Sequence, residues 1–458
     1  MSRYKAYAEY KDSGVEWLGK IPVHWGTSKV RYMFSFDKGL TITKENLQNE
    51  GVPCVNYGEV HSRYGFEVDP SIHALKFVDE QYLISSRNSL LSKGDLIFAD
   101  TSEDIDGSGN FTQLIADQTV FAGYHTIVVR PNNRQNYRFY AYLFDSKELR
   151  TQIRHAVKGV KVFSITQAIL RGVDIWLPAI DEREKIANFL DHETAKIDTM
   201  IAKQQELIKL LKEKRQAVIS HAVTKGLNPN APMRDSGVEW LGEVPAHWIC
   251  KSYRHACNIY RGKFGHRPRN DPAFYDGAYP FIQTGDVAQV RKYITEYRQT
   301  LNEKGKSVSQ LFPAGTLVMT IAANIGDTAI LSFEAYAPDS IVGFKPREDI
   351  DLEYLRYSLM GALPALVQTS TQSTQANLNI ERVGAVQAAF PTKEEQQKIV
   401  RFIDKTLEQY DRFEQKANFG VEILIERRTA LISAAVTGKI DVRNWQHAPV
   451  SELEEAAA

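Results

Sequence analysis

Two long stretches of the chain place their apolar residues in a helical rhythm. From Asp181 to Lys225 the sequence contains neither proline nor glycine, and it is rich in Ala, Leu, Ile, Glu, Gln and Lys, which are good helix formers. Apolar residues recur at intervals of four and three, interrupted by Gln204 and Arg215, which is the spacing of a coiled-coil seam. The pattern predicts a helix over 181–224. Its seam residues are Leu190, Ile197, Ile201, Ile208, Leu211 and Val218.

The second stretch repeats the first later in the chain. The segment "PAIDEREKIANFLDHETAKID" from Pro178 aligns with "PTKEEQQKIVRFIDKTLEQYD" from Pro391, and Arg428 stands in the place of Arg215. The repeat predicts a helix over 394–437. Its seam residues are Ile403, Leu407, Tyr410, Val421, Leu424 and Leu431.

We expect the two seams to face each other in an antiparallel pair. A chain that runs out along one helix must come back to build the next module, and each helix would span on the order of 60 Å. Such a pair would act as a ruler between two globular modules. The other interpretation is that these are amphipathic core helices of a larger domain, although charged residues surround each seam on the remaining faces.

The regions before the helices, 26–177 and 249–390, alternate short β-type runs with turn signals. The runs are "DLIFAD", "TIVVRP", "VDIWLP", "TLVMTI" and "IVGFKP". Each region also carries a helix-like segment, "RFYAYLFDSKELRTQIRHAV" in the first and "LEYLRYSLMGALPALVQ" in the second. The sequence predicts an α+β module of about 150 residues, present twice.

A motif repeated almost word for word opens each module. "DSGVEWLGKIPVHW" (12–25) returns as "DSGVEWLGEVPAHW" (235–248), with eleven of fourteen positions identical. We call this the start motif. It begins at positions 12 and 235, whereas the aligned helical segments begin at 178 and 391, so the middle of the second half is ten residues shorter than that of the first. The chain is therefore a tandem duplication with pseudo-two-fold symmetry. We call the repeated start motif and helical segment the frame, and the divergent residues between them the contents.

The frame predicts the order of the parts along the chain. A divergent content inside a fixed frame favours two modules that do the same type of job on different targets, while neutral drift after duplication remains the plainer interpretation. The predicted parts are a first module 1–178, a first spacer helix 179–227, a second module 228–392, a second spacer helix 393–440 and a C-terminal tail 441–458.

Composition places the chain among globular proteins. Its 458 residues suit two or three domains, with 43% hydrophobic and 24% charged residues. No apolar run reaches a bilayer-spanning length, and the first residues lack the apolar core of a signal peptide, so we expect a cytoplasmic protein with no membrane contact. Three irregularly spaced cysteines form no disulfide framework or metal quartet. Because 56 basic residues balance 56 acidic ones, any nucleic-acid binding must use a local basic surface.

The modules lack the common catalytic motifs, which favours binding over catalysis. The sequence contains no Walker A loop, no glycine-rich dinucleotide turn, no HExxH, no nucleophile elbow and no Asn/Asp-Pro-Pro-aromatic sequence of amino-methyltransferases. Acids occur together in "TSEDIDG" (101–107), which has no counterpart in the second half. Paired carboxylates can bind a divalent metal, but a solvated loop is the stronger interpretation, and we expect neither a metal site nor a catalytic residue.

Polar and basic segments in both modules have the residue types that contact DNA. "KGVKVFSITQ" (158–167) and "TSTQSTQANLN" (369–379) precede the two helices at matching places, and "RGKFGHRPRN" (261–270) combines four cations with an aromatic residue. Such side chains bond phosphates and base edges, although solvated loops look alike. The candidates are Lys158, Lys161, Ser164, Thr166, Gln167, Arg261, Lys263, His266, Arg267, Arg269, Ser373, Gln375 and Asn377.

From about Tyr10 to Trp445 the chain resembles the DNA-specificity subunit of type I restriction-modification systems. The resemblance rests on the start motif and its repeat, "KGDLIFAD", "HTIVVRP", "LPAIDEREKIANFLD", "FPTKEEQQKIVRFID" and "VTGKIDVR". It implies a non-catalytic subunit with two target-recognition domains, each reading one half of a split DNA site. Two helices packed antiparallel would set the spacer.

The resemblance also implies partners and cofactors. Two methyltransferase subunits would carry S-adenosylmethionine and two motor-nuclease subunits would carry ATP and Mg²⁺, so that this chain binds no cofactor itself. Two other functions remain open. The chain could be a scaffold whose modules grip proteins, with the helices as a dimerisation rod. It could also be a nuclease or methyltransferase with an unfamiliar site at "TSEDIDG".

Overall fold

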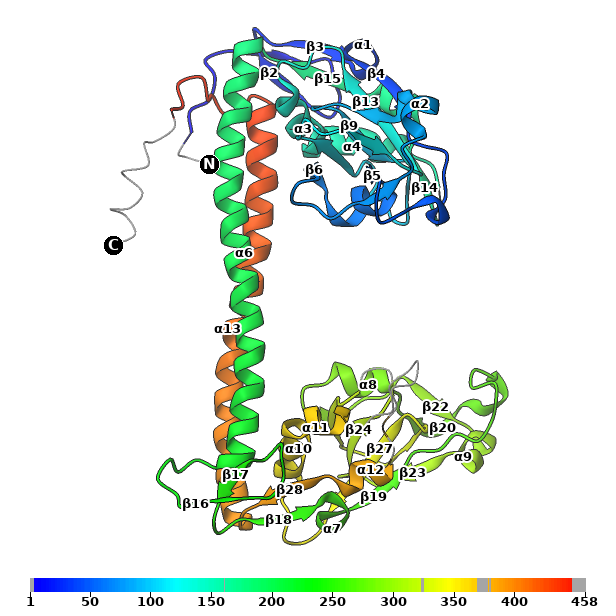
Figure 1. Ribbon diagram of the computed structural model, residues 1–458, viewed down its shortest axis with the longest axis vertical. Helices are drawn as coiled ribbons and strands as arrows, with labels where there is room; N and C mark the ends of the chain where they lie inside the picture. The colour runs from blue at the N-terminus through cyan, green and yellow to red at the C-terminus, as the bar shows by residue number, and fades with distance from the viewer. Residues whose placement is uncertain (1–3, 160, 323–324, 369–377, 379, 447–458) are drawn as a thin grey trace. The chain divides into compact units, whose positions relative to one another are not determined.

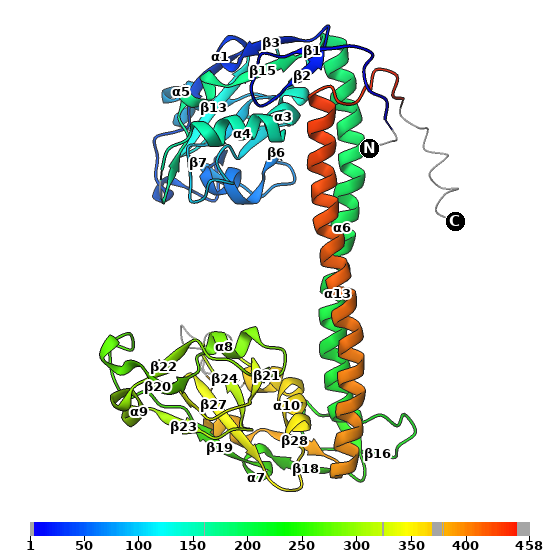
Figure 2. The same cartoon turned by 180° about the vertical axis from the view of Figure 1, so that it is seen from behind.

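The computed structural model shows two compact units (Figures 1 and 2). One consists of Met1–Lys203 with Gly420–Ala458, and the other of Gln204–Phe419. The predicted helices are present as α6 (Ile180–Lys225) and α13 (Lys393–Val436), and each contributes one part to each unit. The described residues are 4–159, 161–322, 325–368, 378 and 380–446.

The first unit has three layers, in which a five-stranded sheet lies between helices and a four-stranded sheet. Strand β9 (Leu96–Ala99) shows the arrangement, because side chains alternate along a strand. Leu96 and Phe98 face the core that contains α3 (Tyr137–Asp145), α4 (Lys147–Ala156) and the long helices, whereas Ile97 and Ala99 face the four-stranded sheet. The five-stranded sheet has the order β4 (Phe34–Lys38), β13 (Thr126–Pro131), β9, β11 (Phe111–Leu114), β6 (Phe66–Val68), and the four-stranded sheet β7 (Lys76–Val78), β5 (Val52–Val55), β12 (Val120–Ala122), β8 (Leu90–Leu91).

The second unit repeats this architecture. Leu317 and Met319 of β24 face the helical core, and Val318 between them faces the four-stranded sheet. The α+β class predicted for both modules is confirmed. The five-stranded sheet has the order β19 (Cys257–Arg261), β27 (Ile341–Pro346), β24 (Leu317–Thr320), β25 (Thr328–Leu331), β21 (Tyr293–Ile294), and the four-stranded sheet β22 (Gln299–Leu301), β20 (Tyr275–Phe281), β26 (Ala335–Ala337), β23 (Gln310–Phe312).

Each helix-like segment of the sequence is two helices in the structure. The first breaks at Ser146, which has an extended backbone between α3 (Tyr137–Asp145) and α4 (Lys147–Ala156). The second breaks between α10 (Leu352–Gly361) and α11 (Leu363–Gln368), where Pro364 has no N–H to continue the first helix. The remaining α-helices of the described residues are α1 (Val30–Met33), α2 (Tyr82–Ser85), α5 (Gln167–Gly172), α7 (Tyr253–Ala256), α8 (Thr284–Gln289), α9 (Glu303–Val308) and α12 (Ile380–Ala385).

In each unit the start motif forms a hairpin. The chain then continues into a strand that pairs with the strand leading into the long helix. In the first unit β1 (Tyr10–Asp12) pairs with β2 (Lys20–Pro22), and the chain continues into β3 (Gly26–Lys29). Strand β3 pairs antiparallel with β15 (Asp174–Leu177), which runs directly into α6. The second unit repeats this with β16 (Met233–Asp235), β17 (Glu243–Pro245), β18 (Ile249–Ser252) and β28 (Gln387–Phe390) before α13.

A glutamate in the first turn of each long helix binds the last two residues of the start motif. Glu182 accepts the indole N–H of Trp25 at 3.1 Å and contacts His24 Nε2 at 2.9 Å. Glu395 is its equivalent in the second unit, where it accepts the indole N–H of Trp248 at 3.1 Å and contacts the preceding histidine at 2.9 Å. The repeated Pro-x-His-Trp sequence is therefore the partner of a repeated helix start.

The helices run antiparallel in both units. In the first unit Asp198 pairs with Arg428 at 3.0 Å, while earlier in α6 Lys185 reaches the carbonyl of Arg443, beyond the end of α13. In the second unit Arg215 pairs with Asp411 at 2.6 Å. The earlier Lys212 reaches Glu414. All twelve predicted seam residues are buried or half-buried, and Thr194 and Ala417, which the apolar rhythm did not include, are buried between them.

Every helix among the described residues is too short or too polar to span a lipid bilayer.

Replacing Glu182 with alanine should destabilise the first unit by about 2 kcal/mol, because it leaves the fully buried Trp25 indole N–H without an acceptor. Hydrogen exchange of the first turn of α6 would measure the loss of protection. Glu184→Ala, two residues along on an exposed position, is the matched control and should change little. Equal effects of the two substitutions would contradict the assignment.

Candidate nucleic-acid interface

The basic segment of the second unit is a loop anchored by one aromatic residue. It follows β19, and Phe264 is only 3% exposed, packed against Phe281 and the rest of a small aromatic cluster. Its backbone forms an isolated bridge with Ser309. Because the chain is fixed at this point, the flanking cations Arg261 and Lys263 project as exposed side chains. The phenylalanine that the sequence interleaves with the cations thus serves as an anchor.

Two of the predicted DNA-binding arginines converge on one aspartate. Arg267 Nη2 lies 3.0 Å from Asp339 Oδ2, and Arg269 contacts the other oxygen of the same carboxylate. Arg267 also donates to the carbonyl of Phe264 at 2.6 Å, which orders the loop. Two guanidinium groups on one carboxylate leave one net positive charge at an exposed site. Sequence inspection missed Asp339 because it lies seventy residues further on, between β26 and β27.

The histidine of this loop has a structural partner. His266 Nε2 lies 3.0 Å from Asp271 Oδ2, and its ring stacks on Phe274 with centroids 4.0 Å apart. The backbone N–H of Ala273 and, to a lesser degree, His266 hold the pKa of the Asp271 carboxyl below its usual value. The contact therefore closes the loop on itself, and leaves the arginines and lysine as its outward-facing groups.

A pocket of about 280 Å³ opens beside the basic loop. Strands β20 and β22 pair, and this brings Gln283, just after β20, into hydrogen-bond contact with Gln299. Amide side chains are the groups that read adenine edges. No sequence signal marked these two residues, because they are sixteen positions apart and meet only through the sheet. The pocket is lined by Phe264, Arg269, Asn270, Tyr275, Phe281, Gln283, Thr284, Gln299, Pro338 and Ser340.

The remaining candidates of the second module, Ser373, Gln375 and Asn377, lie outside the described residues.

The candidate segment of the first unit has exposed and structural members. Lys158, Lys161 and Ser164 are exposed, and Ser164 belongs to the short strand β14 (Phe163–Ser164). Thr166 instead caps α5, accepting the N–H of Ile169 at 3.2 Å. The side chain of Gln167 donates to the carbonyl of Asp37 at 3.1 Å. Four of the five candidates are therefore exposed, Thr166 among them, and Gln167 is half-buried. Thr166 and Gln167 also hold the segment through their hydrogen bonds.

The acidic stretch 101–107 lies beside this segment, since β14 pairs with β10 (Thr101–Ser102). Asp104 accepts the N–H of Gly107 at 2.6 Å, and Asp106 pairs with Arg154 at 3.3 Å. These acids order a turn. Among the described residues, no group of three or more His, Cys, Asp or Glu is placed to hold a metal ion. The proximity of acids and lysines could not be seen in the sequence, where almost sixty positions separate them.

The long helices carry large apolar side chains on their exposed faces as well as in the seam. These side chains lie between seam positions, so packing of α6 against α13 leaves them in solvent. The 4-3 spacing of apolar residues predicts the seam positions and gives no signal for these side chains. They include Met200, Leu207 and Leu210 on α6 and Phe402, Phe413, Phe419, Ile423 and Ile425 on α13, each at least 41% exposed.

The chain is similar to specificity subunits of type I restriction enzymes. It is 22% identical over 452 residues to the StySPI specificity subunit of Salmonella potsdam, covering 93% of this chain and 91% of the relative. It is 20% identical over 445 residues to the EcoKI specificity subunit of Escherichia coli K12, with the same two coverages.

A solved chain from a study of complex assembly and conformational transition of a type I R-M system shares the fold. Its TM-score is 0.65 at 15% identity, covering 91% of this chain and 98% of that one.

The family model described as "Type I restriction modification DNA specificity domain" matches the chain twice, over residues 22–209 and 257–422. Each match takes in one module and the start of the long helix that follows it, which agrees with the duplicated frame of the structure. The chain therefore belongs to the type I restriction-modification DNA specificity family.

Proposed function

We propose that this chain is the DNA sequence-recognition subunit of a type I restriction-modification system, and that each module reads one half of an asymmetric bipartite site. The observation that carries the proposal is a duplicated frame around different contents. Both units have the same sheets, start motif and helix start, yet the basic loop with its amide-lined pocket belongs to the second unit, and the exposed lysines beside an acidic turn belong to the first. Different surfaces on one frame suit two different half-sites.

The basic loop of the second module supplies phosphate contacts in this proposal. Arg261 and Lys263 are exposed, and Arg267 and Arg269 share a single carboxylate, so the loop keeps a positive charge that the overall composition lacks. Gln283 and Gln299 beside it offer groups for base edges. Lys158, Lys161 and Ser164 are the corresponding candidates in the first module.

The long helices set the spacer and bind two methyltransferase subunits in this proposal. The ion pairs between the helices all follow one antiparallel register: a step forward along α6 is matched by an equal step back along α13. The pairs are Asp198 with Arg428, Lys212 with Glu414 and Arg215 with Asp411. In this proposal the exposed apolar side chains of α6 and α13 contribute apolar contacts to the methyltransferase subunits.

The chemistry would reside on the partners. Relatives of this chain are specificity subunits, which have no catalytic role, and we propose that two methyltransferase subunits bring S-adenosylmethionine and two motor-nuclease subunits bring ATP and Mg²⁺. Double-stranded DNA is then the only ligand of this chain besides those proteins. No membrane contact is part of the proposal.

The test of the function is a map of adenine methylation in genomic DNA from cells with and without the gene, obtained by single-molecule sequencing. We expect one motif with two unlike halves and a fixed gap, which disappears on deletion. If a methyltransferase partner is expressed and no motif depends on this chain, the recognition function is wrong and the scaffold interpretation takes its place. If the purified chain alone modified or cut DNA, it would be an enzyme.

Deleting one heptad from each helix, 204–210 and 416–422, should shorten the spacer by about 3 base pairs, because seven residues span about 10 Å and each base pair about 3.4 Å. On each helix the deleted segment lies between the ion-pair residue of the first unit and those of the second, so the ion pairs of Asp198 and Arg215 are retained. The methylation map should show both half-sites unchanged. Altered half-sites at an unchanged gap would contradict the ruler.

Replacing Arg267 or Arg269 with alanine should weaken DNA binding and lower the slope of log affinity against log salt by about 1 for each arginine. Binding of the methyltransferase complex to its site at several salt concentrations measures this. Asp339→Asn is the matched control: it frees both guanidinium groups and should not weaken binding. If the salt slope were unaltered in both arginine variants, the loop would be merely solvated and would make no phosphate contact.

A further inference from the structure

The first module is held on α6 through the carboxylate of Asp191. It accepts a hydrogen bond from the Tyr142 hydroxyl at 2.6 Å and pairs with Arg138 Nε at 2.7 Å. Arg138 also pairs with Glu67 at 2.6 Å. Burial and the nearby carboxylate raise the pKa of Tyr142, so its hydroxyl remains a donor. A tyrosine, a cation and a second carboxylate of the module thus surround one helix aspartate.

The second module is held on α13 through Asp404, which aligns with Asp191 when Pro391 is aligned with Pro178. Asp404 accepts a hydrogen bond from the Tyr357 hydroxyl at 2.5 Å and pairs with Lys292 at 3.1 Å. Lys292 also pairs with Glu353 at 2.7 Å. Burial and the hydrogen bond to Asp404 raise the pKa of Tyr357. The second contact therefore has the same four kinds of group as the first.

The two contacts have opposite polarity on equivalent elements. Residue 138 near the start of α3 is an arginine, while residue 353 near the start of α10 is a glutamate. The other module partner is Glu67 on β6 in one case and Lys292 directly before β21 in the other. Both β6 and β21 are the last strands of their five-stranded sheets. Cation and carboxylate have exchanged places, and the helix aspartate still receives its cation.

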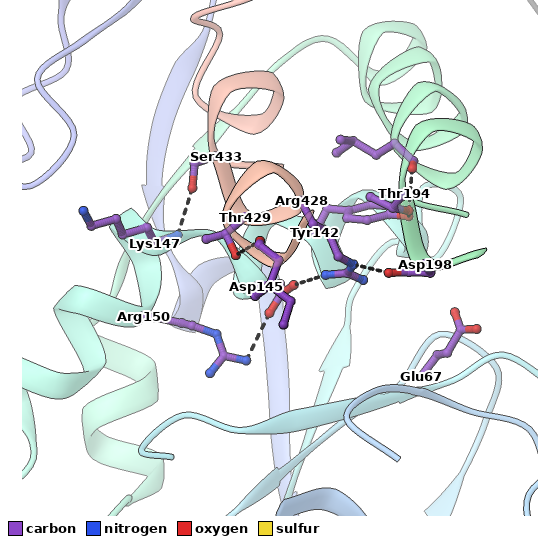
Figure 3. Close-up of polar contacts among 12 residues, drawn as sticks. Glu67, Tyr142, Asp145, Lys147, Arg150, Thr194, Asp198, Arg428, Thr429 and Ser433 are labelled. Atoms are coloured by element: carbon purple, nitrogen blue, oxygen red, sulfur yellow. Dashed lines mark hydrogen bonds and ion pairs between the residues drawn. The ribbon is translucent and has the colours of Figure 1, made fainter. Parts of the chain in front are cut away.

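A second contact of the first module shows what the module contributes there (Figure 3). Arg428 of α13 pairs with Asp198 of α6 at 3.0 Å and with Asp145, the last residue of α3, at 3.3 Å. Arg150 holds the other oxygen of Asp145 at 3.0 Å. The module thus supplies the carboxylate of Asp145 to Arg428, the arginine of the ion pair between the two helices.

The second module supplies a base at the corresponding place. Arg215 and Asp411 are the equivalents of Arg428 and Asp198, and they pair at 2.6 Å. Position 360, which corresponds to Asp145, is a methionine, and Arg291 of the module instead pairs with Asp411 at 2.7 Å. The helix frame is the same in both units, and the charge that the module brings to it is reversed.

We propose that Asp191 and Asp404 are the positioning residues that orient each recognition module on its long helix, and that the module can supply their cation from either of two positions. The proposal rests on the proposed function, since the orientation of a module decides where its DNA-facing loops lie. Single changes during drift would have left like charges in contact at half-buried sites, which is costly. Both members of the pair are reversed together, so the helix aspartate and a module cation form an interaction the unit needs.

The second module already has the cation and the carboxylate at exchanged positions. It therefore shows which two substitutions should reverse the first module without loss of the contact. Arg138→Glu alone places three carboxylates together and should weaken binding to the mapped site at least about tenfold. Glu67→Lys combined with Arg138→Glu copies the arrangement of the second module and should restore affinity to within about threefold. Full-length chain in its methyltransferase complex is used, and discrimination against DNA with a scrambled first half-site is measured beside affinity.

Two milder substitutions, each removing one tyrosine hydroxyl, test the proposal if the Arg138→Glu variant does not fold. Tyr142→Phe should reduce discrimination at the first half-site only, and Tyr357→Phe at the second half-site only, with melting temperatures near that of the unaltered chain. The proposal is overturned if the double variant folds and binds no better than Arg138→Glu, or if neither phenylalanine variant affects its half-site. A complex of the unaltered chain that ignores DNA sequence would overturn the proposed function and leave melting temperature as the readout of these contacts.

Discussion

The carboxylate in the first turn of each long helix is the contact on which the rest of the structure depends. It fixes the indole N–H of a buried tryptophan, so that the end of the start motif and the beginning of the helix meet at one point. An anion at this place also suits the positive end of the helix dipole. The hairpin, the strand that follows it and the strand that feeds the helix are all joined there, and each module is built outward from this joint.

The frame and the contents of each module follow different constraints. The frame must satisfy buried groups, such as Trp176, whose indole N–H reaches the carbonyl of Val436 at 2.5 Å. A change at such a position costs a buried hydrogen bond. Apart from anchors such as Phe264, the candidate loops are largely exposed, and they differ between the units in charge. The structure thereby separates the residues that keep the protein folded from those that give each module its own surface.

The sequence predicted what periodicity and repetition encode and missed what depends on distant residues. Both helices were placed to within a residue at each end, because uninterrupted helix formers and a 4-3 rhythm are local signals, and the runs "TIVVRP" and "IVGFKP" are strands β13 and β27. Ser146 broke a predicted helix without a proline or glycine to signal it. Asp339, Gln283 and Gln299 are brought to the basic loop only by the fold, so the sequence marked the cations of the candidate site and not their partners.

The exposed apolar side chains on the long helices affect how the protein can exist in a cell. Phe402, Phe413 and Phe419 are each at least 45% exposed on one helix, and such groups promote association of chains that have no other protein to cover them. A chain with nothing to cover these helices would therefore be prone to self-association, and its solubility would depend on what covers them.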